Sequence, residues 1–187
     1  MAGPDANHRD EPKDGSGWRL PVRIARMEPR LRMRLNLPVV ELAWRVATGP
    51  AFAEDVEQCL NLPGVTGYVA LTELGHVPAA SWGTRPVLDV WRLCGYMQVY
   101  EARRFLVVQH LLVHPAVQRL GVGSALLERA KLFLCPVIRK RLIVDVRQGS
   151  RYLAAHKFLA AQGLVARLHP DDPDKLRFQL VVGKVAA

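Results

Sequence analysis

Three apolar stretches that follow one another in the middle of the chain constrain the fold more than any other feature. VTGYVALTE (65–73), GYMQVYEA (95–102) and FLVVQHLLV (105–113) are rich in the β-branched and aromatic residues that favour strands. The last two are separated only by Arg103 and Arg104, so a hairpin is expected there. Successive strands need antiparallel connections, and the sequence therefore excludes a doubly wound parallel sheet.

Helical and strand-like patterns lie on both sides of this group. Before it, the alternation of LRMRL (31–35) predicts a strand, and Asn36 to Pro38 predict the start of a helix through VVELAWRVA. A second short helix is expected from about Ala53 to Leu60, and residues 74–92 are predicted to be a long loop. The remaining expected elements are a helix in VGSALLERAKLFL (122–134), a strand in RLIVDVR (141–147), a helix in YLAAHKFLAAQ (152–162) and a strand in KLRFQLVVG (175–183).

The predicted order is β-α-α-β-β-β-α-β-α-β, which indicates an α/β fold with a mixed, mostly antiparallel sheet flanked by helices. The length of 187 residues suits one domain. Residues 1–17 lack apolar periodicity and are predicted to be a disordered tail, which leaves 18–187 as the single domain.

Targeting and redox signals point to the interior of the cell. The N-terminus has no apolar core of a signal peptide, and no apolar run reaches the length of a membrane span, so a cytoplasmic protein with no membrane partner is expected. The three cysteines are an odd number without a CxxC pair, which favours reduced thiols over a disulfide framework or a zinc site.

The charge balance implies an acidic partner. Lys and Arg number 26 against 17 Asp and Glu, a net charge of +9. A phosphorylated small molecule, a nucleic acid or an RNA-rich assembly would each gain from such a field, although direct nucleic-acid binding is not the favoured interpretation. Six arginines fall between Arg19 and Arg34, and a solvated face is the ordinary explanation of such a run.

The sharpest local motif is VHPAVQRLGVGSALL (113–127), which predicts a strand end, a glycine-bearing turn and a helix. Gly121 and Gly123 lack Cβ atoms, so an anion can approach the main chain at the positive end of the helix dipole. Gln118 and Arg119 add donors at the rim. The motif predicts a phosphate-binding turn, although a lone GxG before a helix also occurs simply where a strand and a helix pack closely.

QRLGVG (118–123) resembles the pyrophosphate loop, Q/R-x-x-G-x-G/A, of the GNAT acetyltransferase superfamily, and it follows the fourth expected strand as in that family. The likeness extends from about Leu31 to Val182 and includes FLAAQGL near the end of the last helix, which is similar to the closing segment of the family. Within the superfamily the chain is most similar to the ribosomal-protein-alanine (RimI-type) protein N-terminal acetyltransferases, because IVDVR (143–147) resembles their LEVR.

This resemblance implies an acetyl-CoA-dependent enzyme in which acetyl-CoA, the cosubstrate, crosses the end of the fourth strand. A peptide α-amine would attack the thioester directly, and a ribosomal protein is a possible acceptor. The pantetheine would pair with the main chain of Leu111, Leu112 and Val113. The implied contacts for the rest of the cofactor are Gln118, Arg119, Leu120, Gly121, Val122, Gly123 and Ser124, with Ser150 or Tyr152 in place of a family asparagine.

The resemblance also assigns catalytic positions. Asp145 matches the glutamate base of LEVR and would act through a water, because its side chain is one methylene shorter. The open alternative is an ion pair of Asp145 with a neighbouring arginine such as Arg147 or Arg141 at the strand end. The tyrosine that protonates the leaving thiolate in the family corresponds to Leu159, which cannot donate a proton.

Substitutes for that acid are His156 and Tyr152, or His110 on the fourth strand. His110 and His114 are four residues apart without a third ligand nearby in the sequence, so no metal is expected. Residues 49–53 and 169–175 are where the resemblance implies substrate contacts.

Two other functions stay open at this point. A small amine could replace the protein acceptor, although the arginine excess disfavours cationic acceptors. The chain could also be a CoA-binding or ribosome-associated module with weak catalysis or none. The sequence does not indicate an oligomeric state.

Overall fold

The computed structural model describes residues 19–46, 50–60, 62–73, 91–132, 134 and 141–181. Its elements in chain order are β1 (Arg23–Arg26), α1 (Pro29–Val46), α2 (Pro50–Cys59), β2 (Val65–Glu73), β3 (Trp91–Glu101), β4 (Phe105–Val113), α3 (Val122–Lys131), β5 (Arg141–Arg147), α4 (Leu153–Ala161), β6 (Val165–Leu168) and β7 (Lys175–Val181). Two short 3₁₀ turns, η2 (Pro115–Val117) and η3 (Ser150–Tyr152), precede α3 and α4.

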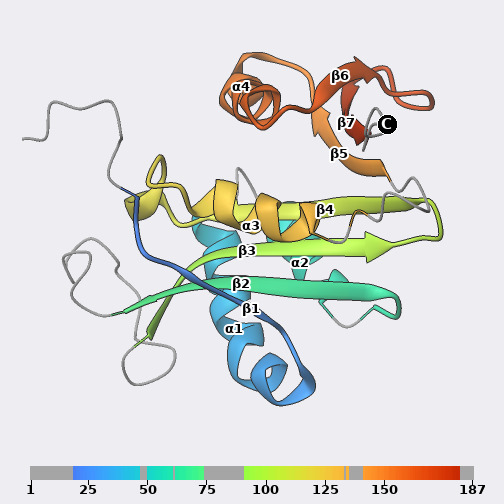
Figure 1. Cartoon of the computed structure of the whole chain (residues 1–187). Coiled ribbons are helices and arrows are strands. Elements are labelled where there is room, and N and C mark those ends of the chain that lie inside the picture. The colour runs from blue at the N-terminus through green and yellow to red at the C-terminus, as the bar shows by residue number, and fades with distance from the viewer. Residues whose placement is uncertain are drawn as a thin grey trace, which may run out of the picture.

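The strands form one seven-stranded sheet in the order β1-β2-β3-β4-β5-β7-β6. β4 and β5 are parallel, and every other neighbouring pair is antiparallel. The expected mixed, mostly antiparallel sheet is therefore confirmed. In Figure 1, β5, β6, β7 and α4 lie above the other four strands, and β5 meets β4 near one end only.

Helices cover both faces of the sheet, and each face has its own core. One core contains Leu126 and Leu127 of α3 and Leu159 of α4, packed on strand residues such as Val108 and Leu142. The other core packs α1 and α2 on the opposite face; its members include Leu35, Val39, Leu42, Val56, Tyr96 and Leu112. Side chains alternate across a strand, so neighbouring residues of one strand enter different cores.

Local pattern predicted most elements correctly. The strands over 65–73 and 141–147 have the predicted bounds, and the hairpin between β3 and β4 is present, with β3 starting earlier at Trp91. In β4, alternate residues are fully buried and several of the others are half-buried, as expected of a central strand.

The strand predicted over LRMRL is wrong, because these residues lie inside α1. The alternation of apolar and basic residues misled because Met33 is 80% exposed. The buried residues of the helix instead follow the helical spacing of Leu35, Val39 and Leu42. Pro38, interpreted from the sequence as part of a helix start, lies in the middle of the helix, where it cannot donate a main-chain bond.

Two short edge strands were missed by the sequence interpretation. β1 pairs with β2, and β6 pairs with β7. All four residues of β6 are exposed, so the segment VARL carries no alternation of buried and exposed positions. In β1, Ile24 and Ala25 pack partly against the two cores. Strands of four residues are too short for side-chain alternation to reveal them.

Several expectations lie outside the described residues: the tail over 1–17, most of the loop over 74–92, and Gly49 of the expected substrate contacts. Among the described residues, no helix is long and apolar enough to cross a membrane.

Candidate functional site

The sheet divides where β4 and β5 separate. The two strands pair in parallel from Phe105 with Arg141 to Val108 with Val144. Beyond these pairs β5 continues beside β7, while β4 continues beside β3 as far as Val113. In the described part of the chain, no strand pairs with the β5-facing edge of β4 after Val108. This edge therefore presents main-chain groups of the residues predicted to hold pantetheine.

A β-bulge marks the same point. Gln98 pairs with His110, but Val99 pairs with Val108, so Gln109 is an extra residue in β4. The bulge changes which face of the sheet the alternate side chains of β4 enter. Val108 lies in the core on the α3 side, whereas Leu112 lies in the core on the side of α1 and α2. Gln98 donates to the Gln109 side chain (Nε2 to Oε1, 3.0 Å) and accepts from the Tyr96 hydroxyl at 2.7 Å.

The turn between β4 and α3 has two residues in the left-handed region. They are Arg119 with a φ of 66° and Gly121 with a φ of 86°. The left-handed conformation of an arginine costs about 1 kcal/mol or more of conformational free energy. Strained residues of this kind often cluster at functional turns. No side chain caps the helix at Gly121, and an early helical bond runs from the Ala125 amide to the Gly121 carbonyl. Because the amides before Ala125 have no helical partner, the turn has the geometry of an anion site.

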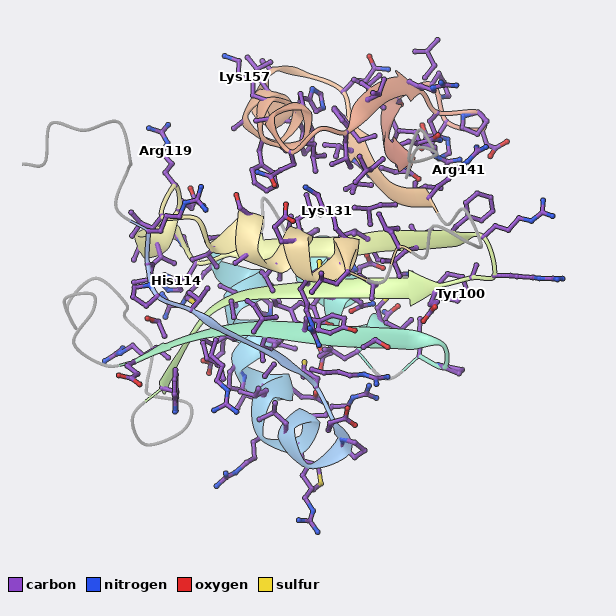
Figure 2. The ribbon with its side chains drawn as sticks, viewed as in Figure 1. Tyr100, His114, Arg119, Lys131, Arg141 and Lys157 are labelled. Carbon is purple, nitrogen blue, oxygen red and sulfur yellow. The ribbon has the colours of Figure 1, made fainter. Side chains whose placement is uncertain are left out.

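Arg19 is a neighbour of this turn that the sequence interpretation missed. A Cβ at Gly121 would lie 3.4 Å from Cγ of Arg19, and the Leu20 amide donates to the Leu120 carbonyl at 2.9 Å. In Figure 2, Arg119 projects from the turn away from the sheet. Two exposed arginines 100 residues apart in the sequence therefore flank one turn. The only signal in the sequence was the run of arginines that begins at Arg19.

Contacts between α3 and α4 close the other side of the turn. Gln162 donates to the Ser124 hydroxyl at 3.1 Å, and its carbonyl accepts from Lys131 Nζ at 3.0 Å. Figure 2 shows Lys131 on α3, pointing toward α4. A Cβ at Gly123 would lie 3.3 Å from Phe158 and 3.5 Å from Val113, so glycine is what lets α3, α4 and β4 approach here.

Asp145 forms an ion pair, but with neither of the arginines predicted. Arg177 lies opposite it on β7 and donates through Nε to Oδ1 at 2.8 Å and through Nη2 to Oδ2 at 2.9 Å. Nε2 of His169 is 3.2 Å from Oδ2. The predicted alternative of an ion pair is thus present, with a partner 32 residues away instead of Arg147 or Arg141.

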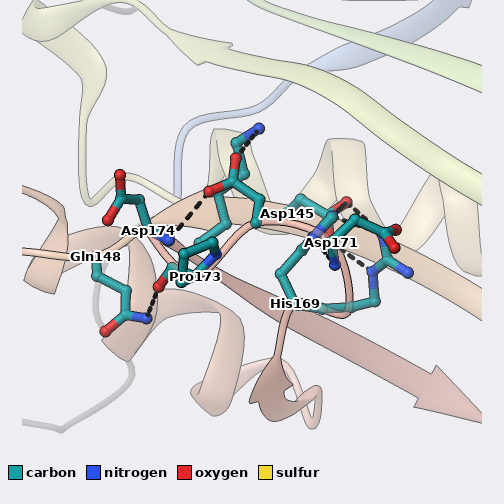
Figure 3. Close-up of polar contacts among 9 residues, drawn as sticks. Asp145, Gln148, His169, Asp171, Pro173 and Asp174 are labelled. Carbon is teal, nitrogen blue, oxygen red and sulfur yellow. Dashed lines mark hydrogen bonds and ion pairs between the residues drawn. The ribbon is translucent and has the colours of Figure 1, made fainter.

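The hydrogen bonds of His169 select its tautomer. The Asp171 amide donates to Nδ1 at 3.1 Å, so in the neutral ring the proton is on Nε2 and is directed to Asp145. Arg177 Nη2 lies 2.8 Å from the same nitrogen and is therefore a close neighbour of it, not a second donor to it. Figure 3 shows these contacts beside the bond from Gln148 to the Pro173 carbonyl.

Burial by itself would raise the pKa of Asp145. The hydrogen bonds and charge of Arg177, with a smaller contribution from His169, outweigh burial, and the pKa of Asp145 is lowered. The carboxylate is therefore held ionised and is a weak base.

The other predicted catalytic side chains lie at the start of α4. His156 Nε2 is 2.9 Å from the Arg147 carbonyl and must donate to it, because a carbonyl only accepts. Its ring also contacts Phe178, with 5.5 Å between centroids. Tyr152 is half-buried and has a partner of its own, whereas Ser150 is exposed. Leu159 is 2% exposed and belongs to the core.

His110 and His114 lie in different surroundings. His114 Nδ1 accepts from the Ala116 amide at 3.2 Å and caps the turn η2. His110 faces α2, where its Nε2 is 3.3 Å from Asp55 Oδ2 and its ring meets Phe52 edge to face. Burial lowers the pKa of His110, although the charge of Asp55 opposes the shift.

Two comparisons of sequence find no match to this chain. No family model matches it, and no curated protein matches it. Solved structures do match. The E. coli ribosomal-protein-S18-alanine N-acetyltransferase is similar with a TM-score of 0.59 and 15% identity, over 89% of this chain and 99% of that one.

Two other solved structures support the same likeness. A protein from Desulfovibrio desulfuricans that is assigned to the GNAT family has a TM-score of 0.62 and 16% identity, over 87% of this chain and 100% of that one. The PaiA N-acetyltransferase of Thermoplasma acidophilum, solved with coenzyme A, has a TM-score of 0.57 and 12% identity, over 87% and 99%. At these identities the likeness is one of architecture, and this chain has the fold of the GNAT acetyltransferases.

Proposed function

We propose that this protein is an acetyl-CoA-dependent N-acetyltransferase. The observation that carries the proposal is the separation of β4 from β5 after Val108, next to a turn whose amides precede α3. The free edge of β4 suits the amide groups of pantetheine, and the turn with Arg119 and Arg19 suits a diphosphate. The protein's net charge of +9 favours such a tetra-anionic class of cosubstrate.

The transfer needs little from the protein beyond positioning. The neutral amine of the acceptor attacks the thioester carbonyl, a C–N bond forms, and the C–S bond breaks with the electron pair leaving on sulfur. The amine loses one proton and the thiolate gains one. Asp145, His156 and Tyr152 are the predicted groups for these protons, and each of them has a partner in this structure. We therefore expect the rate to depend mainly on how the donor and acceptor are held.

The acceptor we favour is a protein or peptide α-amine, as the RimI-type likeness of IVDVR suggests and as the similarity to a ribosomal-protein acetyltransferase supports. A CoA-binding module without turnover is the second candidate. It is favoured by one observation: the carboxylate of Asp145 is committed to Arg177.

Calorimetry with acetyl-CoA tests the proposed cradle. Arg119→Ala and Arg19→Ala should each weaken binding by about tenfold, the equivalent of one charge-assisted contact, and should lessen its salt dependence. Gly123→Val should weaken binding more, because the new side chain would enter the space between Phe158 and Val113. Arg104→Ala is the matched control, because Arg104 is exposed at the opposite end of β4. This variant should bind acetyl-CoA as the natural chain does.

Release of free thiol with Ala- and Ser-initiated peptides then separates the two candidate functions. Thiol release that depends on the peptide supports the transferase. Binding without thiol release across a broad panel of amines would favour the module, and unchanged affinity in all three variants would overturn the cradle itself.

A further inference from the structure

Three side chains capable of binding a metal meet between α2 and β4. Asp55 and Cys59 lie one helical turn apart on α2 and share a face of that helix. His110 is the first residue of β4 after the bulge and faces α2. One ligand atom from each of the three lies within 4.8 Å of the other two. The sequence interpretation did not group these three residues, because it paired His110 only with His114 on the same strand.

The spacing of these atoms is close to what tetrahedral coordination needs. His110 Nε2 is 3.3 Å from Asp55 Oδ2, and Cys59 Sγ is 3.8 Å from Asp55 Oδ1. Zinc with ordinary bond lengths to nitrogen, oxygen and sulfur places N and O about 3.3 Å apart and S and O about 3.5 Å apart. The two distances end on different oxygens of Asp55, so its carboxylate must turn to offer one oxygen to an ion that His110 and Cys59 also bind.

The surroundings fix two of the three ligands and leave one side open. The side chain of His110 is only 6% exposed, and its ring is held edge to face against Phe52. Gln98 donates to the Cys59 carbonyl at 3.4 Å, which ties the end of α2 to the sheet. The side chain of Asp55 is 59% exposed, so an ion and a water can reach the group from solvent.

The donor set selects the class of ion. One thiolate, one imidazole and one carboxylate suit Zn²⁺ and disfavour Mg²⁺ and Ca²⁺, which prefer oxygen ligands. We propose that Asp55, Cys59 and His110 bind a single Zn²⁺ ion, with water as its fourth ligand, and that the ion fastens the last turns of α2 to β4.

Binding requires that the protons be relocated. Cys59 releases its thiol proton to solvent, and the proton of the neutral His110 ring moves from Nε2 to Nδ1. Nδ1 of His110 is buried without a hydrogen-bond partner among the described residues, so the metal-bound ring would carry an unpaired N–H. For this reason we expect micromolar affinity and not the tighter binding of a fully supported structural site.

Cobalt(II) is a suitable probe, because a thiolate ligand gives a charge-transfer band in the near ultraviolet and tetrahedral geometry gives intense visible bands. Titration of the full chain with Co²⁺ should show both bands at one equivalent, and Zn²⁺ should displace them. Cys59→Ser should remove the charge-transfer band, and Asp55→Asn should weaken binding at least tenfold. Glu57→Gln, on the same helix but outside the group, is the matched control and should bind as the natural chain does.

Zn²⁺ should also raise the melting temperature of the natural chain, and by more than that of Asp55→Asn, which changes an exposed side chain and should fold normally. The site is overturned if Co²⁺ gives no more than weak octahedral bands in the natural chain. It is also overturned if the charge-transfer band survives in Cys59→Ser. These readouts do not involve acetyl-CoA, so they can fail while the proposed function stands.

Discussion

Replacing Arg177 tests the pairing that the structure gives to Asp145. In Arg177→Ala the carboxylate would remain between β5 and β7 without its two charged hydrogen bonds. A charge-assisted bond contributes about 1.5–3 kcal/mol, and loss of one partner of a buried pair costs more. The two side chains are 23% and 24% exposed, so solvent and His169 recover part of this loss. We expect the free energy of unfolding to fall by about 2 kcal/mol, which lowers the melting temperature by about 4–8 °C.

The effect should depend on pH in one direction. The pKa of Asp145 is lower in the folded protein than in the unfolded chain, because Arg177 outweighs burial. Such a pair stabilises the fold fully above an unfolded pKa of about 4, and the stabilisation is lost as the pH falls through the lowered folded value. The difference between the natural chain and Arg177→Ala should therefore be constant from pH 7 to pH 5 and should shrink toward pH 2.

Urea unfolding followed by circular dichroism over this pH range measures the difference. Arg147→Ala is the matched control: its side chain is exposed on the same strand as Asp145, and its loss should change the free energy of unfolding by less than about 0.5 kcal/mol. A cost in Arg147→Ala equal to that in Arg177→Ala, or a difference that does not diminish at low pH, would refute the assignment of the pair.

Two further predictions follow from the fold and the site. Pro38→Ala should raise the free energy of unfolding by about 1–2 kcal/mol in urea unfolding, because it restores a main-chain bond in the middle of α1; an unchanged or lower stability would count against a continuous helix there. Removal of a general base lowers kcat by roughly 100-fold or more. Asp145→Asn should lower kcat for peptide acetylation by less than this, because the ion pair already weakens Asp145 as a base. A loss of about 1,000-fold with intact acetyl-CoA binding would restore Asp145 as the base.

The sequence was most informative where local pattern and packing agree. The strand over 65–73 and the turn before α3 depend on β-branched residues and on glycine, whose preferences act over a few residues. LRMRL misled because its alternation fits a strand, although the segment is stabilised as helix by Leu35, Val39 and Leu42 against the sheet. Tertiary burial outweighed the local signal there.

By itself, the sequence predicted most of the main elements, the mixed sheet and a glycine-bearing turn before α3, because these follow largely from local residue preferences. Only the tertiary structure decided which distant side chains meet. Arg177 reaches Asp145 because β7 pairs with β5, and Asp55 and Cys59 reach His110 because a bulge turns it toward α2. Strand pairing and helix packing fix such contacts, and the separation of two residues in sequence carries no information about either.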